Sequence, residues 1–464
     1  MKLKHDREHP FDSDVPIHNW YYPLAVDTLP LSPTGVGQFL DMTRGGPAVR
    51  RALYLHIPFC DTICSFCPFI RKSAAENDLV DAYFSLLLAE LRAKSKLSDA
   101  KINAIFVGGG TPSLLSARQV HELGETIQSS FDLSEMQEFS FEMEVKSVTV
   151  EKLRALKAIG VTNARLGVQT LNDQARNLFE LSIPAKDAKS ALALMLSNFD
   201  LVSADMLYAY DGQAQKDWEA DIGEIVDTGV PLIDIYPLNP VASQTRLHKS
   251  AKRLGLAPPT ARTRHDYRLT ASDLLANAGY VPHNGHGFIR SRASACPTTD
   301  TYHFDYHEHV YGYKNYEILG FGVNAISNIQ GISLQNTGLI HQYMKDVSER
   351  GIPRAALGRS DTYSRESRPL IFRLPYFGSV EKAAIDFLNV YPETLESLLA
   401  LVQHGMVEDT GPTFQMTRQG WIWYTNCTYF LLPQHEKRMI DVQVSNARKD
   451  KRAALENMHL RLDA

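Results

Sequence analysis

The sequence has few cysteines and no long apolar run. Five cysteines occur among 464 residues, an odd number that does not suit the disulfide framework of a secreted protein. No stretch reaches about 18 consecutive apolar residues, so no membrane span is expected. The first residues, MKLKHDREHPFDSD, are charged and polar, unlike a signal peptide. We therefore expect a cytoplasmic protein without a membrane partner.

The sequence also lacks an excess of positive charge. Lys and Arg number 48 against 53 Asp and Glu, which gives a formal net charge of −5 at pH 7. Tight nucleic-acid binding depends on a basic face, so no nucleic-acid partner is expected. Repeats beyond a helix–strand alternation and low-complexity segments are also missing. A hydrophobic content of 44% over this length predicts a large buried core, divided among two or three domains.

After residue 50 the sequence alternates regularly between apolar strands and amphipathic helices. This alternation predicts an α/β fold with a parallel sheet. Six units without a clear break favour a partial (β/α)6 barrel over a doubly wound fold in two domains. In a barrel, the chemistry is expected in the loops that follow the strands. The six predicted strands are 52–59, 102–110, 139–145, 163–170, 201–209 and 232–238.

Four regions are expected along the chain. The N-terminal arm is rich in proline, and the region after the barrel is an extension with a helix near 260–278 and a substrate lid. The C-terminal region reads as a winged-helix-like α+β domain with a terminal helix. Its GPTF turn lacks a basic cluster, which disfavours nucleic-acid binding. The regions are 1–50 (arm), 51–240 (barrel), 241–365 (extension and lid) and 366–464 (C-terminal domain).

Three of the five cysteines crowd into the string YLHIPFCDTICSFCPFIRK, directly after the first predicted strand. Structural zinc usually takes four ligands in two close pairs, but Cys296 and Cys427 are isolated. A redox C-x-x-C pair accounts for Cys64 and Cys67 but leaves Cys60 idle. Three thiolates on a [4Fe–4S] cluster leave one iron open for another ligand. Three incidental core thiols are the structural alternative.

The spacing C-x-x-x-C-x-x-C in this context resembles the radical S-adenosylmethionine (SAM) superfamily. The longer string YLHIPFC…CSFC is similar to the branch around oxygen-independent coproporphyrinogen III oxidase, the HemN-like branch. That branch also includes a heme chaperone and the class C radical methyltransferases and cyclopropanases. The resemblance implies that Cys60, Cys64 and Cys67 hold a [4Fe–4S] cluster whose open iron binds SAM. Electron transfer then cleaves SAM to methionine and a 5′-deoxyadenosyl radical.

The same resemblance implies SAM contacts at the ends of the later strands. The glutamates of FEMEV share one face of their strand, because alternate residues of a strand point the same way. The structural alternatives are a tight turn for the glycines, an exposed edge strand for the glutamates and a loop cap for the aspartate. The implied contacts are Gly109, Gly110 and Thr111 in GGGTP, Glu142 and Glu144 in FEMEV, Gln169 in LGVQT and Asp205 in ADMLYA, with Glu142 also a candidate for catalysis.

Two further segments carry candidate residues. The Gly-rich string LGFGVNAIS resembles a family segment near a second SAM, which implicates Gly322, Asn324 and Ala325. A plain strand turn is the alternative there. Tyr54 and His56, on the first strand, are candidate catalytic contacts near the cluster, and simple packing is the alternative for both.

A stretch rich in histidine and aromatic residues follows the barrel region. One interpretation is a surface loop of amphipathic residues. The other is a substrate lid, in which aromatic rings stack on a flat substrate and histidines move protons near neutral pH. The histidines are His283, His286, His303, His307 and His309.

Two departures from the oxidase pattern bear on the reaction. Coproporphyrinogen oxidases extend the cysteine string to a fourth cysteine, and this chain has Phe69 there. An arginine that the family often carries in an L-G-R string is replaced by Leu181, and neither Arg165 nor Arg176 can be assumed to take its role.

The missing fourth cysteine favours the class C enzymes. That group uses two SAM molecules to transfer a methyl or methylene carbon to an sp2 carbon of a flat unsaturated substrate. We therefore expect methylation or cyclopropanation of an aromatic, indole-like or tetrapyrrole substrate, in antibiotic and other natural-product biosynthesis or in anaerobic heme breakdown. The alternatives are a coproporphyrinogen oxidase-type decarboxylation and a heme-binding chaperone. A monomer reduced by a flavodoxin- or ferredoxin-type donor is expected.

Overall fold

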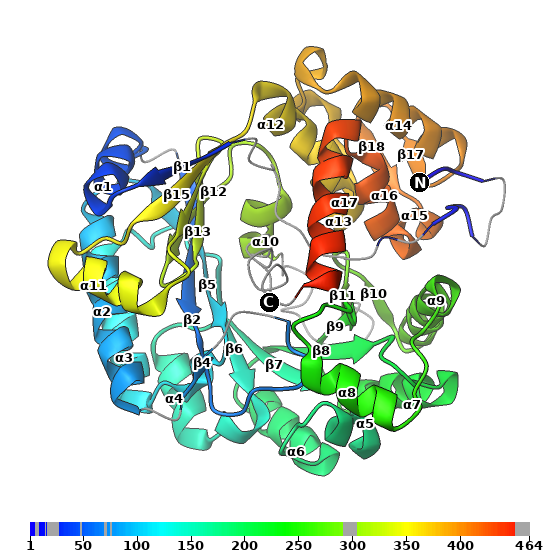
Figure 1. Ribbon diagram of the computed structural model, residues 1–464, viewed down its shortest axis with the longest axis horizontal. Coiled ribbons are helices and arrows are strands. Elements are labelled where there is room, and N and C mark those ends of the chain that lie inside the picture. Colours follow the sequence, from blue (N-terminus) through cyan, green and yellow to red (C-terminus); the bar gives the residue numbers. More distant parts are fainter. Residues whose placement is uncertain are drawn as a thin grey trace.

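The computed structural model describes residues 1–4, 9–13, 15, 27–46, 49–68, 72–74, 77–290 and 304–450. Within these residues, thirteen strands form one curved sheet, which Figure 1 shows as an open arc. Along the sheet the strands are β1 (Asp27–Leu31), β15 (Ala355–Arg359), β14 (Ile332–Asn336), β13 (Ile326–Ile329), β12 (Glu317–Phe321), β2 (Arg50–Ile57), β5 (Lys101–Gly109), β6 (Glu138–Glu144), β7 (Asn163–Gln169), β8 (Leu201–Tyr208), β9 (Leu232–Pro237), β11 (Gly287–Arg290) and β10 (Tyr280–Pro282).

The strands predicted from the alternation form the centre of this sheet. Along the run β2-β5-β6-β7-β8-β9 each strand pairs in parallel with the next, as a partial barrel requires, and the short strands β3 (Phe59–Cys60) and β4 (Lys72–Ser73) pair separately. β12 adds a further parallel strand beside β2, and β11 pairs antiparallel with β9. The helices between the strands cover the outer side of the arc (Figure 1). These helices are α2 (Asn77–Ser95), α3 (Ala117–Ser130), α4 (Val150–Ala158), α5 (Asp173–Leu178), α6 (Ala185–Leu196) and α7 (Gln215–Asp227).

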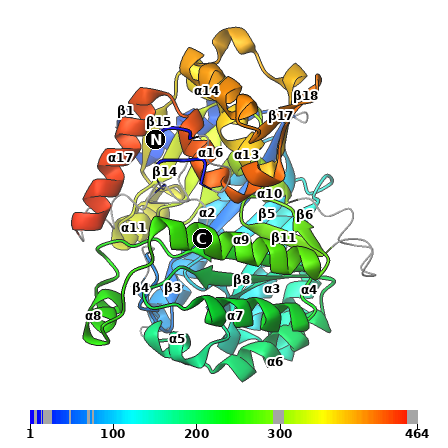
Figure 2. The ribbon, with the colours of Figure 1, turned by 90° about the vertical axis from the view of Figure 1, so that its right-hand side faces the viewer.

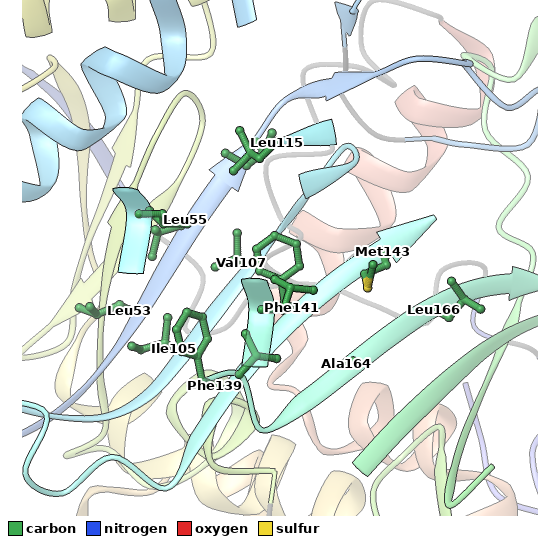
Figure 3. Close-up of a cluster of buried hydrophobic side chains, with 14 of the residues drawn as sticks. Leu53, Leu55, Ile105, Val107, Leu115, Phe139, Phe141, Met143, Ala164 and Leu166 are labelled. Atoms are coloured by element: carbon green, nitrogen blue, oxygen red, sulfur yellow. The ribbon is translucent and has the colours of Figure 1, made fainter. Parts of the chain in front are cut away.

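Both faces of the central strands are buried, as in other parallel sheets. Alternate residues Leu53 and Leu55 point to the helix side, while Ala52 and Tyr54 belong to a second core on the inner side. Figure 3 shows the helix-side core, to which the later strands add labelled residues such as Phe141. The inner side is filled by α10 (Asp305–Tyr311) and by the C-terminal region.

The N-terminal arm and the extension both contribute to the sheet. β1 pairs antiparallel with β15, so part of the arm is an edge strand, which the sequence did not predict. The predicted helix near 260–278 is confirmed as α9 (Ala261–Asn277). The remaining helices of these regions are α1 (Pro33–Met42), α8 (Thr245–Arg253) and α11 (Ile340–Arg350).

The C-terminal region combines helices with a three-stranded sheet in the order β16-β18-β17 and lies above the barrel in Figure 2. Residues 379–389 form β16 followed by two 3-10 turns and no α-helix. The side chain of Asp386 caps the second of these turns, and Pro392 begins the next helix. The elements are α12 (Thr362–Arg368), a π-helix (Pro369–Arg373), α13 (Leu374–Phe377), β16 (Ser379–Glu381), two 3-10 turns (Lys382–Ala384 and Phe387–Asn389), α14 (Pro392–Gln403), β17 (Val407–Asp409), β18 (Thr413–Met416), α15 (Arg418–Ile422), α16 (Tyr424–Leu431) and α17 (Gln434–Lys449).

The structure bears in different ways on the predicted terminal helix, the region boundaries and the expected absence of a membrane span. The rest of the predicted terminal helix, 451–464, lies outside the described residues, and the boundaries of the four regions stay predictions. In the described part of the chain, no helix has both the length and the apolar character needed to cross a membrane.

Candidate active site

The cysteine loop lies where β2 ends and lines a pocket at the carboxyl ends of the parallel strands. Cys60 is buried and Cys64 and Cys67 are partly buried, and all three line this one pocket. The loop is held in place by groups outside it. Ser65 Oγ donates to the carbonyl oxygen of Leu178 at 2.8 Å. The protein therefore fixes the loop through its own contacts, as a preformed cluster site requires.

The donor set fits a [4Fe–4S] cluster. Within the described ranges, no three His, Cys, Asp or Glu side chains converge as they would on a single metal ion. The three cysteines, which lie on one loop and line one pocket, offer a thiolate to each of three irons. Cys427 is buried in the inner core, away from the loop, and burial raises the pKa of its thiol. Cys296 and Phe69 lie outside the described residues.

The glycines of GGGTP form the pocket wall beside the cysteines. Gly109 has φ +117°, and a Cβ on Gly110 would lie 2.6 Å from the carbonyl oxygen of Phe59. Only glycine fits such a close approach. The Gly110 N–H also donates to the carbonyl oxygen of Ile57 at 2.7 Å. The end of β5 therefore packs directly on the backbone that leads into Cys60, and both glycines and Thr111 line the pocket.

The two glutamates of β6 lie on the same wall. Oε2 of Glu142 accepts a hydrogen bond from the Gly109 N–H at 3.1 Å. Glu144 accepts one from Ser147 Oγ at 3.1 Å, and burial raises the pKa of Glu144. Both glutamates line the pocket, and β6 pairs with β5 on one side and β7 on the other, so the edge-strand alternative is wrong for this segment.

Gln169 closes the end of β7 in a strained backbone conformation. Its φ of +71° lies in the left-handed region, which costs a residue with a side chain roughly 1–3 kcal/mol. A Cβ on Gly167 would lie 2.7 Å from Gln169 Nε2, so the side chain folds back over that glycine. Gln169 lines the pocket. Strain of this kind tends to occur at functional sites.

Asp205, on β8, faces the same pocket and forms part of a buried ion-pair cluster. Arg165 of β7 donates to Asp205 Oδ1 at 3.2 Å and also pairs with Asp234 of β9. Burial, together with the nearby Asp234, raises the pKa of Asp205, and Arg165 opposes that shift. Arg165 is therefore a pocket residue held between two carboxylates. Arg176 also lines the pocket, but its guanidinium donates to backbone carbonyl groups.

Comparison with known proteins identifies the family. The family model described as "Radical SAM superfamily" matches residues 54–225, from β2 to α7. The stretch from β2 to α7 is thus a radical SAM domain. Its cofactors are accordingly a [4Fe–4S] cluster and SAM, and the three cysteines of the pocket provide the fitting donor set.

Over most of its length the chain is similar to curated proteins of the HemN-like branch. It is 28% identical to an anaerobilin synthase of Escherichia coli O157:H7 over 391 residues, 81% of this chain and 82% of that one. It is 27% identical to the heme chaperone HemW of Lactococcus lactis, over 68% of this chain and 79% of that one. An oxygen-independent coproporphyrinogen III oxidase of Salmonella typhimurium is 25% identical, over 82% and 85% of the two chains.

A solved structure shares the radical SAM fold of this chain. Coproporphyrinogen III oxidase (HemN) from Escherichia coli superposes with a TM-score of 0.74 at 21% identity, covering 89% of this chain and 96% of that one. The expected α/β radical SAM fold, with its additional helical and sheet domain, is thereby confirmed. The names of the relatives do not support the expected methyltransferase, cyclopropanation and antibiotic-biosynthesis functions.

Tyr54 and His56, the two catalytic candidates on β2, lie behind the glycine wall of the pocket. Tyr54 belongs to the inner core, and its hydroxyl lies 2.8 Å from Nδ1 of His56. A Cβ on Gly109 would lie 2.7 Å from the same nitrogen, so the His56 ring packs against the back of the glycine wall. Burial lowers the pKa of His56 to about 4, which makes the ring neutral near pH 7. Of the three catalytic candidates, Glu142 alone lines the pocket.

The segment proposed for a second SAM lies elsewhere. Gly322, Asn324 and Ala325 do not line the pocket described here. The Gly322 N–H donates to Glu90 Oε2 at 2.8 Å, and its carbonyl oxygen accepts from Asn336 at 2.7 Å. Because other parts of the chain already bind this backbone, the structure supports a structural turn, and cofactor binding there stays a prediction.

Three histidines of the histidine-rich stretch lie in the protein interior. His286, His307 and His309 are buried, so the surface-loop interpretation is wrong for them. His283 is partly buried, and His303 lies outside the described residues. Lys146 and Tyr236 are among the pocket residues that the sequence left unremarked. Nothing in the spacing of either residue would have indicated a place in the pocket.

Proposed function

We propose that this chain is a radical SAM enzyme that acts on a tetrapyrrole and takes hydrogen from that substrate, in the manner of a coproporphyrinogen oxidase. The observation that carries the proposal is the composition of one pocket. The cysteine loop and the predicted SAM contacts line it together with an apolar surface that suits a flat, largely apolar ring system. That surface consists of Phe66, Leu181, Ile183, Leu207, Tyr236 and Leu238.

The relatives support the same substrate class. Their names refer to heme, to coproporphyrinogen and to a bilin, all of them tetrapyrroles. Each similarity extends over two thirds or more of this chain, so it covers more than the domain that binds the cofactors. An indole-like substrate has no such support.

The chain's own residues have distinct tasks in this proposal. When bound, the cluster and SAM supply an electron and a carbon-centred radical that abstracts hydrogen. The cysteine loop holds the cluster, and Glu142 fixes the Gly109 backbone against which SAM is expected to lie. Gln169, which lines the same pocket, is expected to contact the same ligand. The apolar surface excludes water, which protects a reactive intermediate.

The test is anaerobic reconstitution of the cluster, followed by incubation with a reductant, SAM and coproporphyrinogen III or heme. The proposal predicts 5′-deoxyadenosine that depends on the tetrapyrrole, together with a modified tetrapyrrole; carbon dioxide identifies decarboxylation. Stoichiometric heme binding without any modified product contradicts the proposal and indicates a chaperone.

A second candidate is one-carbon transfer to an sp2 carbon of the tetrapyrrole. It is favoured by Phe69, which stands where the oxidases carry a fourth cysteine. Its signature is S-adenosylhomocysteine formed together with 5′-deoxyadenosine. A flavodoxin- or ferredoxin-type donor and a monomeric state stay predictions for either reaction.

A further inference from the structure

A buried chain of hydrogen-bonded rings lies behind the substrate side of the pocket. The Tyr376 hydroxyl lies 2.9 Å from Nε2 of His286 and 2.6 Å from Nδ1 of His307. Nδ1 of His286 lies 2.8 Å from the Tyr424 hydroxyl. All four side chains are at least nine-tenths buried. None of them belongs to the predicted cofactor contacts.

The four hydrogen-bonded rings share their protons in a fixed donor–acceptor order. Burial lowers the pKa of His307 well below its usual value and raises those of Tyr376 and Tyr424, so these three groups are neutral near pH 7. A phenol has one proton to donate, and Tyr376 contacts a nitrogen of each histidine. It therefore donates to one histidine and accepts from the other. The orientation of each ring then depends on its partner, which makes the chain of rings a single unit.

Each of the two histidines among these rings supports, directly or through a neighbour, a residue that lines the pocket. The ring of His286 packs on Tyr236 at a centroid distance of 4.6 Å. The ring of His307 stacks on Phe304 at 3.6 Å, and the Arg165 guanidinium lies 5.0 Å from the centroid of that Phe304 ring. Tyr236 is thus held from behind by one histidine of the hydrogen-bonded unit, and Arg165 is held by the other histidine through Phe304.

The turn that carries His286 is shaped for this contact. A Cβ on Gly285 would lie 2.5 Å from the ring of Tyr424 and 2.7 Å from that of Tyr376. Asn284 Oδ1 accepts from the backbone N–H of His286 at 3.1 Å. The carbonyl oxygen of His286 in turn accepts from the Ile235 N–H at 3.0 Å, which ties the turn to β9 beside Tyr236.

The two tyrosines come from the C-terminal region. Tyr376 lies on α13 and Tyr424 on α16, whereas His286 and His307 belong to the extension after the barrel. Figure 1 shows α10, which carries His307, between the sheet and these C-terminal helices. The C-terminal region therefore does more than cover the open side of the barrel.

We propose that Tyr376 is a positioning residue for substrate binding. Through its hydrogen bonds to His286 and His307, it fixes the positions of two pocket residues, Tyr236 and Arg165, relative to each other. The assignment of the pocket to a tetrapyrrole rests on the proposed function. The role of Tyr376 itself rests on the contacts above. In this arrangement the C-terminal region completes the substrate side of the active site without contacting the cofactors.

The test compares Tyr376→Phe with Tyr311→Phe in the reconstituted protein. Tyr311 is a buried tyrosine whose ring packs on Tyr376 at 4.3 Å, so it is a matched control outside the chain of rings. Loss of the Tyr376 hydroxyl is expected to lower tetrapyrrole-dependent kcat about tenfold, as loss of one positioning contact does. It is also expected to increase the 5′-deoxyadenosine released per product, while iron content and SAM affinity stay unchanged. Tyr424→Phe is expected to act in the same direction.

A second readout needs no substrate. Hydrogen exchange at the Ile235 amide, which donates to His286, is expected to be faster in Tyr376→Phe and unchanged in Tyr311→Phe. Equal exchange and equal kcat in both variants overturn the proposal. The proposal is also overturned if both variants lose thermal stability while the 5′-deoxyadenosine released per product stays unchanged. That result indicates a purely structural role. Failure of the proposed function gives a different result, because the wild type itself then lacks tetrapyrrole-dependent turnover. The hydrogen-exchange measurement still decides the role of Tyr376 in that case.

Discussion

The backbone nitrogen of Gly109 donates to Oε2 of Glu142 at 3.1 Å, which joins the ends of β5 and β6 at the wall beside the cysteine loop. This contact connects two motifs, GGGTP and FEMEV, that are more than thirty positions apart in the chain. It places a carboxylate and a flexible glycine backbone on one surface of the pocket. Several of the predictions below depend on that surface.

Replacing Glu142 by Gln is expected to weaken SAM binding. Hydrogen bonds to charged groups contribute about 1.5–3 kcal/mol, so the Kd for SAM is predicted to rise about tenfold or more. Iron content is expected to stay unchanged, since Glu142 is not a cluster ligand. Equilibrium binding to the reconstituted variant measures this, and Glu135→Gln, at a more exposed carboxylate, is the control. An unchanged Kd for Glu142→Gln rules out the assigned role.

Replacing any one of the three loop cysteines is expected to abolish the intact cluster. Cys64→Ala removes one thiolate, so reconstituted iron and sulfide content and the visible absorbance are predicted to fall to a small fraction of the wild-type values. Cys427→Ala is the matched control, because this thiol lies in the inner core away from the loop. It is expected to keep the cluster with a modest loss of stability. Full iron content in Cys64→Ala contradicts the ligand assignment.

Gln169→Gly separates stability from ligand binding. Glycine relieves the left-handed strain but increases the entropy of the unfolded chain, and the two effects are of similar size, about 1 kcal/mol each. Thermal stability is therefore expected to change little, while SAM affinity falls. Gln330→Gly is the control, since Gln330 also has positive φ, at +53°, and does not line the pocket. Equal SAM affinity in both variants argues against a binding role for Gln169.

Glu138 predicts a pH dependence of stability. Burial raises the pKa of Glu138 from 4.5 to about 7, although hydrogen bonds from Ser140 and from the Tyr306 N–H oppose the shift. The folded state then binds more protons than the unfolded state between these values, so its contribution to stability declines as pH rises from about 4.5 to 7. Glu138→Gln removes this loss. Melting temperatures should show the variant gaining on the wild type from pH 5 to pH 8, and a constant difference contradicts the assignment.

Much of the fold could be predicted because its signal is local. The apolar alternation determined the central strands from β2 to β9, and the spacing of Cys60, Cys64 and Cys67 indicated the cluster loop. The edge of the sheet could not be predicted in this way. β1 joins β15 across more than three hundred residues, and nothing near Asp27 in the sequence indicates that partner.

The candidate site divides along the same line. Residues in the carboxyl-terminal halves of the strands, such as Gln169 and Asp205, could be placed from the barrel rule. The ring chain could not, because Tyr376 and Tyr424 lie about 90 and 140 positions from His286 and meet it only through packing of the C-terminal region. Cofactor binding at LGFGVNAIS stays a prediction. Its glycines suggest a ligand turn, yet the Gly322 backbone is bound by Glu90 and Asn336.

The central claim is that the reaction begins with removal of hydrogen from the tetrapyrrole itself. Its most direct test is a single turnover with a deuterated tetrapyrrole and unlabelled SAM, followed by mass analysis of 5′-deoxyadenosine. The account predicts one deuterium in the 5′-deoxyadenosine, transferred from the substrate. Unlabelled 5′-deoxyadenosine, together with deuterium incorporation when the SAM methyl group is labelled instead, would contradict it and establish one-carbon transfer.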